Sequence, residues 1–205
     1  SKNMNEKNKI NIFIAIVAVL FVGLFLLGKT NKNEGREINA DSGIKEKISF
    51  KEAVGQKAPD FELESIAGEQ IKLSDYLGKN VVLFFNEGSM CYPACWNQIA
   101  ELGNDSRFDT ESAVAFSIVT DPRSQWLDIV SKSANLTKSK IIFDTSRSVS
   151  QSYDVLNLNS SMHRGSLPGH TYFIIDKQGI IRFTMDDPNM ALANDKLIKE
   201  IEALK

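Results

Sequence analysis

The chain has 205 residues, enough for one domain of ordinary size with an additional segment, and 42% of them are hydrophobic. Its formal net charge of -2 shows no sign of the basic surface that nucleic-acid binding requires, so we expect no nucleic acid among its partners. The chain contains 2 cysteines, too few for a scaffold held together by several disulfides, and their close spacing marks a candidate chemical site.

An apolar run without charged side chains extends over residues 10–27. A helix of this length is just able to cross a hydrocarbon core of roughly 30 Å. Gly28 and Lys29 follow the run without the small-residue cleavage site of a signal peptide. We therefore predict a transmembrane helix over 10–27, preceded by an N-terminal tail over 1–9. We expect a single-pass protein of the cell membrane whose globular domain lies on the extracytoplasmic side.

Residues 28–49 are polar and have no sustained apolar period, which predicts a linker. Over residues 50–205 apolar runs alternate with amphipathic segments, which predicts an α/β domain with a central sheet and helices on both faces. A turn over 176–179 joins the last two predicted strands. Helices are predicted after Asp121-Pro122 and near the C-terminus. The predicted strands cover residues 81–85, 114–119, 141–143, 171–175 and 180–183.

The two cysteines, Cys91 and Cys95, follow the predicted strand 81–85. Pro93 suits the first turn of a helix, so we expect Cys91 at or just before a helix N-terminus and Cys95 about one turn later on the same side. This spacing fits the Cα separation of a disulfide, roughly 4.4–6.8 Å. The helix N-terminus stabilises a thiolate, so we expect Cys91 to attack and Cys95 to resolve, in an accessible loop. Two buried thiols that only fill core space are the alternative.

Several ordered motifs resemble one known family. They are residues 55–63 (GQKAPDFEL), 73–79 (LSDYLGK), 81–85 (VVLFF) and 173–182 (FIIDKQGIIR). Together they are similar to the AhpC/TSA (peroxiredoxin-like, redoxin) branch of the thioredoxin-like proteins, over about residues 50–205. The resemblance implies a thioredoxin-like fold with a central mixed sheet, and a thiol-based oxidoreductase, without selecting one activity.

Peroxide reduction is one activity that the resemblance implies. It would require a Thr or Ser three residues before the peroxide-reacting cysteine and an Arg from a later strand. Gly88 stands three residues before Cys91, Tyr92 stands three before Cys95, and His170 stands where the Arg is expected. The groups that would position and polarise a peroxide are therefore not evident, and this activity is our third hypothesis.

Thiol–disulfide exchange is our main hypothesis, since the chain also resembles the membrane-anchored TlpA and ResA proteins. Those proteins have two residues between their cysteines, whereas this chain has three. The resemblance implies a cis-proline opposite the thiols, which we assign to Pro168. We expect Tyr92 and Trp96 to form a partner-binding rim and His170 to tune the thiolate. The partners would be protein thiols or disulfides, and no cofactor is needed.

Copper handling is the remaining alternative, because the spacing of Cys91 and Cys95 equals that of Sco proteins. The Sco resemblance implies a distant histidine ligand, and His163 and His170 both precede the late strand 171–175. Two thiolates and an imidazole suit copper, with Met90 or Met162 as a further soft ligand. Two cysteines with both histidines would also fit tetrahedral zinc. A loop histidine is more often a hydrogen-bonded surface group.

Overall fold

The computed structural model describes residues 46–204. The predicted tail (1–9), the predicted transmembrane helix (10–27) and most of the predicted linker (28–49) lie outside the described residues. Within residues 46–204, no helix combines the length and the apolar character needed to cross a membrane.

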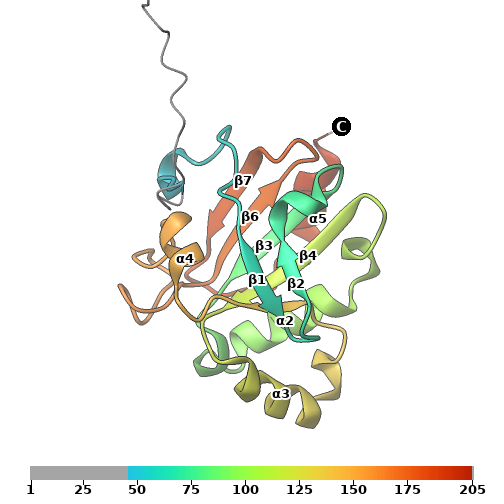
Figure 1. Ribbon diagram of the computed structural model, residues 1–205, viewed down its shortest axis with the longest axis vertical. Helices are drawn as coiled ribbons and strands as arrows, with labels where there is room; N and C mark the ends of the chain where they lie inside the picture. Colours follow the sequence, from blue (N-terminus) through green and yellow to red (C-terminus); the bar gives the residue numbers. More distant parts are fainter. Residues whose placement is uncertain (1–45, 205) are drawn as a thin grey trace, which may run out of the picture. The chain divides into compact units, whose positions relative to one another are not determined.

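A seven-stranded mixed sheet forms the centre of the described domain, with strand order β2-β1-β5-β4-β3-β6-β7 (Figure 1). β3, β4 and β5 run parallel to one another, and every other neighbouring pair is antiparallel. The strands are β1 (Glu62–Ser65), β2 (Gln70–Lys72), β3 (Asn80–Phe85), β4 (Ala113–Val119), β5 (Ile141–Phe143), β6 (Thr171–Ile175) and β7 (Ile181–Asp186).

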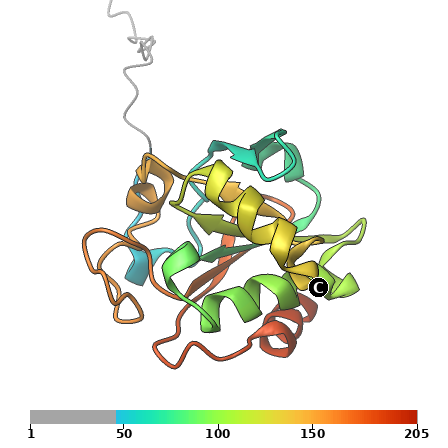
Figure 2. The same cartoon turned by 90° about the horizontal axis from the view of Figure 1, so that it is seen from below.

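Helices cover both faces of the sheet, as the sequence predicts. Figure 2 shows α2 and α5 side by side, and a hydrogen bond of 2.9 Å from Gln98 Nε2 to Asn194 Oδ1 joins them. One face packs against α2 (Ala94–Asn104), α3 (Arg123–Lys132) and α5 (Asn194–Glu202). The other face packs against α4 (Ser148–Ser152) and the 3-10 helix η1 (Phe50–Glu52). Four more 3-10 helices lie in the connections: η2 (Leu73–Tyr76), η3 (Gly88–Met90), η4 (Ser106–Phe108) and η5 (Ala134–Leu136).

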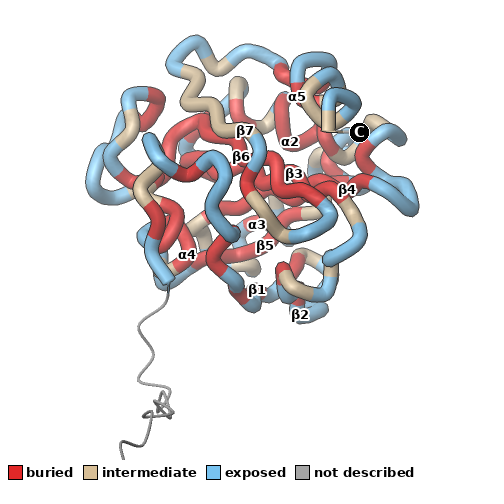
Figure 3. The backbone as a smooth tube through the Cα atoms, turned by 90° about the horizontal axis from the view of Figure 1, so that it is seen from above, coloured by how far each residue is buried: buried red, intermediate tan, exposed pale blue. Residues whose placement is uncertain are grey.

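The central strands are buried on both faces (Figure 3). Along β3, Leu83 and Phe85 pack toward α4, whereas Val82 and Phe84 pack toward α2. Successive side chains of a strand point to opposite faces, so a strand covered on both sides needs apolar residues without interruption. This burial explains why β3 is a continuous apolar run, and it holds the loop after Phe85 at the edge of a rigid sheet.

The predicted strand boundaries agree closely with the structure. Strands 141–143 and 171–175 are confirmed, β3 and β4 each begin one residue earlier than predicted, and β7 covers 181–186 instead of 180–183. In the turn before β7, Gly179 has φ +82° as expected. β1, β2 and α4 were not among the predicted elements, because β1 and β2 are short and largely polar and α4 has only 5 residues.

The start of α3 differs from the prediction in detail. The helix begins at Arg123, and Pro122 occupies the N-cap position instead of the first helical position. The carboxylate of Asp121 does not cap this helix. It binds the loop before Cys91, which the sequence pattern did not indicate.

Candidate redox site

Cys91 and Cys95 form a disulfide at the end of β3, with their Cα atoms 5.3 Å apart. The helix α2 begins at Ala94, later than predicted, so Cys91 precedes the helix and Cys95 is its second residue. Pro93 holds the N-cap position, and the amide of Cys95 donates to the Cys91 carbonyl oxygen at 2.9 Å. The pair therefore joins the end of η3 to the first turn of α2.

Both cysteines are buried, in contrast to the accessible loop that the sequence predicts. Cys91 is 3% exposed and Cys95 is 1% exposed. The thioether sulfur of Met190 lies 3.9 Å from Cys91 Sγ. Met190 belongs to the segment between β7 and α5 and has φ +51°, which is unusual for a residue with a side chain. This segment covers the Cys91 side of the disulfide.

His170 lies against the other sulfur of the disulfide. Its Nδ1 is 3.6 Å from Cys95 Sγ, and its Nε2 is 2.7 Å from the hydroxyl of Tyr172. Phe84 packs edge-on against the imidazole at 4.6 Å and stacks on the Tyr172 ring at 4.7 Å. Since β3 and β6 are neighbouring strands, the sheet itself holds these rings under the disulfide.

The imidazole of His170 is uncharged near neutral pH. Burial lowers its pKa from the ordinary 6.5 to about 4, because the charged form loses its hydration. Asp187, the Ala191 backbone and Asp186 act in the opposite direction but do not offset the burial. Burial also raises the pKa of the Tyr172 hydroxyl, so that this group stays protonated. Two neutral groups therefore connect the disulfide to β6.

The loop before Cys91 is held by Asp121, which follows β4. Asp121 accepts hydrogen bonds from the amide of Ser89 (2.9 Å), from its hydroxyl (2.7 Å) and from the indole N–H of Trp126 (2.8 Å). Gly88 turns the chain here with φ +64°. A Cβ on this glycine would lie 1.9 Å from an Asp121 carboxylate oxygen. The position three residues before Cys91 therefore has no room for the hydroxyl residue of a peroxide site.

Glu87 is buried and holds the loop around residue 162. It accepts hydrogen bonds from the Ser161 hydroxyl (3.1 Å) and from the amides of Met162 (2.6 Å) and His163 (2.9 Å). The His163 ring lies 3.2 Å from the same carboxylate. His163 is thus engaged with Glu87, whereas His170 faces the disulfide.

The predicted metal ligands are not assembled into one site. Within residues 46–204, no group of three or more His, Cys, Asp or Glu side chains could hold a metal ion. Cys91 and Cys95 are joined to each other, and of the two histidines only His170 contacts a cysteine, whereas the His163 ring contacts Glu87. The exposed side chains of Met90 and Met162 have no recorded contact with a cysteine sulfur.

Pro168 does not have the role assigned to it. The cis peptide bond of the described chain is Tyr92–Pro93, between the two cysteines, and the bond before Pro168 is trans. Pro168 is buried next to Gly169, where a Cβ would lie 2.1 Å from the Ser160 hydroxyl. The close approach of these backbones, and not a cis-proline, shapes this part of the site.

Tyr92 and Trp96 form an aromatic rim beside the disulfide. Tyr92 is 72% exposed, and its ring lies edge-on to Trp96 with centroids 5.1 Å apart. Trp96 is half-buried and packs against the buried Trp126 at 5.7 Å. Tyr92 is therefore exposed beside the disulfide, and Trp96 supports its ring.

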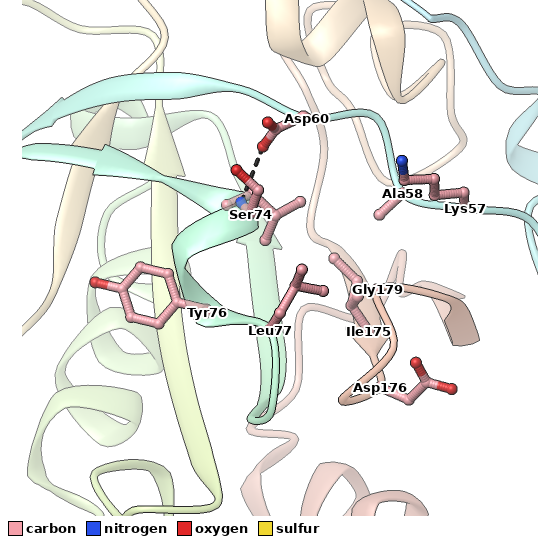
Figure 4. Close-up of a pocket in the computed structure, with 10 residues that line it drawn as sticks. Lys57, Ala58, Asp60, Ser74, Tyr76, Leu77, Ile175, Asp176 and Gly179 are labelled. Carbon is pink, nitrogen blue, oxygen red and sulfur yellow. Dashed lines mark hydrogen bonds between the residues drawn. The ribbon is translucent and has the colours of Figure 1, made fainter.

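A hollow of about 100 Å³ lies at the other end of β3, away from the disulfide (Figure 4). Lys57, Leu77 and Asp176 are among the residues that line it. The dashed line in Figure 4 marks the amide of Ser74 donating to Asp60, which satisfies that carboxylate. Both carboxylates of its lining are thus engaged in the fold, since Asp176 also pairs with Arg182.

Sequence reasoning missed the contacts of three residues of the site. Asp121 and Met190 contact the cysteine segment from distant positions, and Glu87, within the loop before Cys91, binds the loop around residue 162. A buried acidic residue directly after a strand is the one available signal for Glu87. Met190 and Asp121 carry no such signal, since their contacts span 99 and 32 positions of sequence.

The comparisons with known proteins agree with this architecture. The model of the AhpC/TSA family matches residues 54–184. The chain is 32% identical over 127 residues to peroxiredoxin Bcp of Bacillus subtilis, covering 62% of this chain and 80% of that protein. It is 29% identical over 163 residues to the chloroplastic 2-Cys peroxiredoxin BAS1 of Spinacia oleracea, covering 74% of this chain. The chain spans 59% of the length of that relative.

A solved structure supports the fold independently. The crystal structure of peroxidoxin BcpB from Mycobacterium tuberculosis superposes with a TM-score of 0.61 at 22% identity, covering 75% of this chain and 98% of that one. At this identity the likeness establishes the fold alone. With the family match and the mixed sheet, the chain belongs to the AhpC/TSA family and has a thioredoxin-like fold.

Proposed function

We propose that this chain is a thiol-dependent oxidoreductase whose Cys91–Cys95 pair alternates between disulfide and dithiol. The disulfide at the end of β3 is the observation that carries the proposal. It lies where the sheet, α2 and His170 meet, and an exposed aromatic residue stands beside it. Membership of a family whose relatives are peroxiredoxins supports thiol redox chemistry at this place.

Protein disulfides and thiols are the proposed substrates. In the reducing direction, the Cys91 thiolate attacks one sulfur of a partner disulfide and expels the other partner sulfur as a thiolate. Cys95 then attacks Cys91, restores the internal disulfide and releases the second partner thiolate. Two electrons pass to the partner, and the reverse sequence oxidises a partner dithiol.

Peroxide reduction is the second candidate, favoured by the names of the relatives. Here one cysteine thiolate would attack a peroxide oxygen, release an alcohol or water and become a sulfenic acid. The other cysteine would displace water from that sulfenic acid and form the disulfide. The absence of a hydroxyl side chain at Gly88 and the burial of both cysteines weigh against fast peroxide chemistry.

Rapid mixing of the reduced protein with each oxidant distinguishes the two candidates. Trp96, next to Cys95, should report disulfide formation through its fluorescence, with Cys91→Ser as the blank. We expect oxidised glutathione to restore the disulfide faster than it oxidises a free dithiol, and hydrogen peroxide to act no faster than on free cysteine. A much faster reaction with peroxide would favour the second candidate. If each oxidant reacts with the reduced protein no faster than with the free dithiol or free cysteine, the redox proposal is wrong.

We propose further that residues 10–27 anchor the protein in the cell membrane, with the redox domain on the extracytoplasmic side. The uncharged apolar run supports this location. The full chain should remain in the membrane fraction after alkaline carbonate extraction, and protease added to intact spheroplasts should degrade the domain. The variant Ile16→Lys with Leu20→Lys should be extracted. Extraction of the parent by carbonate would contradict the anchor. Protection of the domain from the added protease would contradict its orientation.

A further inference from the structure

The two sulfurs of the disulfide have chemically different neighbours. Cys95 Sγ lies 3.6 Å from a ring nitrogen of His170, whereas Cys91 Sγ lies 3.9 Å from the thioether of Met190. A thioether cannot donate a hydrogen bond, but an imidazole N–H can. His170 can therefore stabilise a negative charge on Cys95, whereas Met190 provides no such donor for Cys91.

We propose that His170 donates a hydrogen bond from Nδ1 to the sulfur of Cys95 and holds Cys95 as a thiolate whenever the disulfide is open. This inference rests on the proposed function and identifies His170 as a catalytic residue of the same site. It also fixes the order of the chemistry, because the stabilised sulfur is the one that leaves when the disulfide is attacked.

The proposed hydrogen bond to Cys95 implies one tautomer of His170. A disulfide sulfur carries no proton, so a hydrogen bond to Cys95 requires the ring proton on Nδ1. The neutral ring then has an unprotonated Nε2, which accepts the hydroxyl proton of Tyr172 at 2.7 Å. Both contacts are satisfied by one tautomer of a neutral imidazole, and the low pKa of His170, about 4, agrees with a neutral ring.

The surroundings make such a donor necessary. Cys95 is 1% exposed, and burial among apolar groups disfavours a charged sulfur. The charged groups that act on the His170 ring are Asp186 and Asp187, from the end of β7 and just beyond it, while β6 contributes the neutral Tyr172. No Lys or Arg in residues 46–204 is recorded in contact with the disulfide or with His170. The imidazole N–H is the donor that can offset the burial of Cys95.

The attack of a partner thiolate on the disulfide neither takes up nor releases a proton. A partner thiolate attacks Cys91 Sγ, the new partner–Cys91 bond forms, and the Cys91–Cys95 bond breaks. The bonding electron pair remains on Cys95 Sγ. The resulting thiolate accepts a hydrogen bond from the Nδ1–H of His170. In reverse, the Cys95 thiolate attacks Cys91 and expels the partner thiolate. His170 keeps its proton throughout, since its loss would require a buried tyrosinate at Tyr172.

The direct test measures the pKa of Cys95 in the full chain carrying Cys91→Ala. Thiolate absorbance in the ultraviolet, followed against pH, should give a pKa below the ordinary thiol value of about 8.5. Adding His170→Phe should raise it by at least about one unit, because the donor is lost and the burial remains. The matched control is His163→Phe, which removes the histidine that faces Glu87. An unchanged pKa in His170→Phe, or an equal rise in the control, would overturn the proposal.

A second variant, Tyr172→Phe, tests the same hydrogen bond if His170→Phe does not fold. Tyr172→Phe preserves the ring stacked on Phe84 and removes only the hydroxyl that fixes the tautomer. It should raise the pKa of Cys95 by a smaller amount, since the ring proton can then move to Nε2. No rise in Tyr172→Phe would overturn the assigned tautomer. The pKa measurement uses no partner protein. It therefore tests the role of His170 even if the parent shows no exchange activity.

Discussion

The carboxylate of Asp121 occupies the space that a side chain at Gly88 would need. A Cβ on Gly88 would lie 1.9 Å from an Asp121 oxygen, and the backbone there has φ +64°. Two independent features therefore require glycine three residues before Cys91. The Asp121 carboxylate, which follows β4, leaves no space at this position for the hydroxyl residue that peroxide chemistry would use, and this favours thiol–disulfide exchange.

Replacing Gly88 should destabilise the domain more than replacing another glycine of the same conformation. Gly88→Ala adds both backbone strain and the contact with Asp121, and should lower the free energy of unfolding by at least about 2 kcal/mol. Gly55→Ala is the matched control, since Gly55 has φ +90° and nothing within 4 Å of the added Cβ. That change should cost about 1 kcal/mol. Urea unfolding of both variants measures the difference.

A double-mutant cycle isolates the contact itself. In an Asp121→Ala background, Gly88→Ala should cost about as much as Gly55→Ala, because the colliding carboxylate is gone. Equal costs for Gly88→Ala and Gly55→Ala in the parent would show that Asp121 moves aside freely.

Removal of the Glu87 carboxylate should release the loop around residue 162. The amides of Met162 and His163 both donate to Glu87, so Glu87→Ala should speed their hydrogen exchange relative to the parent. Exchange in β4 should stay unchanged and serves as the internal reference. The same measurement on Asp75→Ala, which removes an acidic side chain of η2, should leave both loop amides protected. Protection that persists in Glu87→Ala would mean that the backbone alone holds this loop.

The main strands could be predicted from the sequence, because a strand buried on both faces must be an uninterrupted apolar run, as in β3. The cysteine pair and its place after β3 were equally evident. The predicted start of α2 is too early, because Pro93 suits the first turn of a helix but occupies the N-cap position here. Side-chain contacts between distant segments leave no local pattern in the sequence. The contact of Met190 with Cys91 and that of Asp121 with Ser89 could therefore be found only in the structure.

The burial of His170 makes stability depend on pH in a defined window. The pKa of His170 falls from 6.5 to about 4 on folding, so between these values the unfolded chain binds more protons. The domain should therefore lose on the order of 3 kcal/mol of stability as the pH falls from 6.5 to about 4, and no more from this group below that. Urea unfolding at a series of pH values measures this slope.

Two comparisons separate His170 from other groups in that experiment. His170→Phe should flatten the slope in this window, whereas His163→Gln should keep it. Hydrogen bonds from Arg107 lower the pKa of Asp105 from 3.8 to about 2, so its contribution is lost only at still lower pH. If the free energy of unfolding of His170→Phe still falls between pH 6.5 and about 4, a different group causes the pH dependence in this range.

Met190 should limit access to the disulfide from the Cys91 side. Met190→Ala removes the thioether that lies 3.9 Å from Cys91 Sγ, and dithiothreitol should then reduce the disulfide several-fold faster. Met162→Ala is the control, because Met162 is 64% exposed and has no recorded contact with either sulfur. Equal reduction rates in parent and Met190→Ala would show that reagents approach by another route.

The assignment of Cys91 as the attacking sulfur and Cys95 as the resolving sulfur is tested most directly by adduct formation in single-cysteine variants. Reduced Cys95→Ser and Cys91→Ser are mixed with the aromatic disulfide dithionitrobenzoate, and mass spectrometry follows the mixed disulfide over time. At a pH above the pKa values of both thiols, Cys95→Ser should form a stable adduct at Cys91 faster than Cys91→Ser forms one at Cys95, because a thiolate whose pKa is lowered by a hydrogen bond is the weaker nucleophile and the better leaving group. The parent should resolve its adduct to the internal disulfide. Equal rates, or a faster reaction at Cys95, would contradict this account.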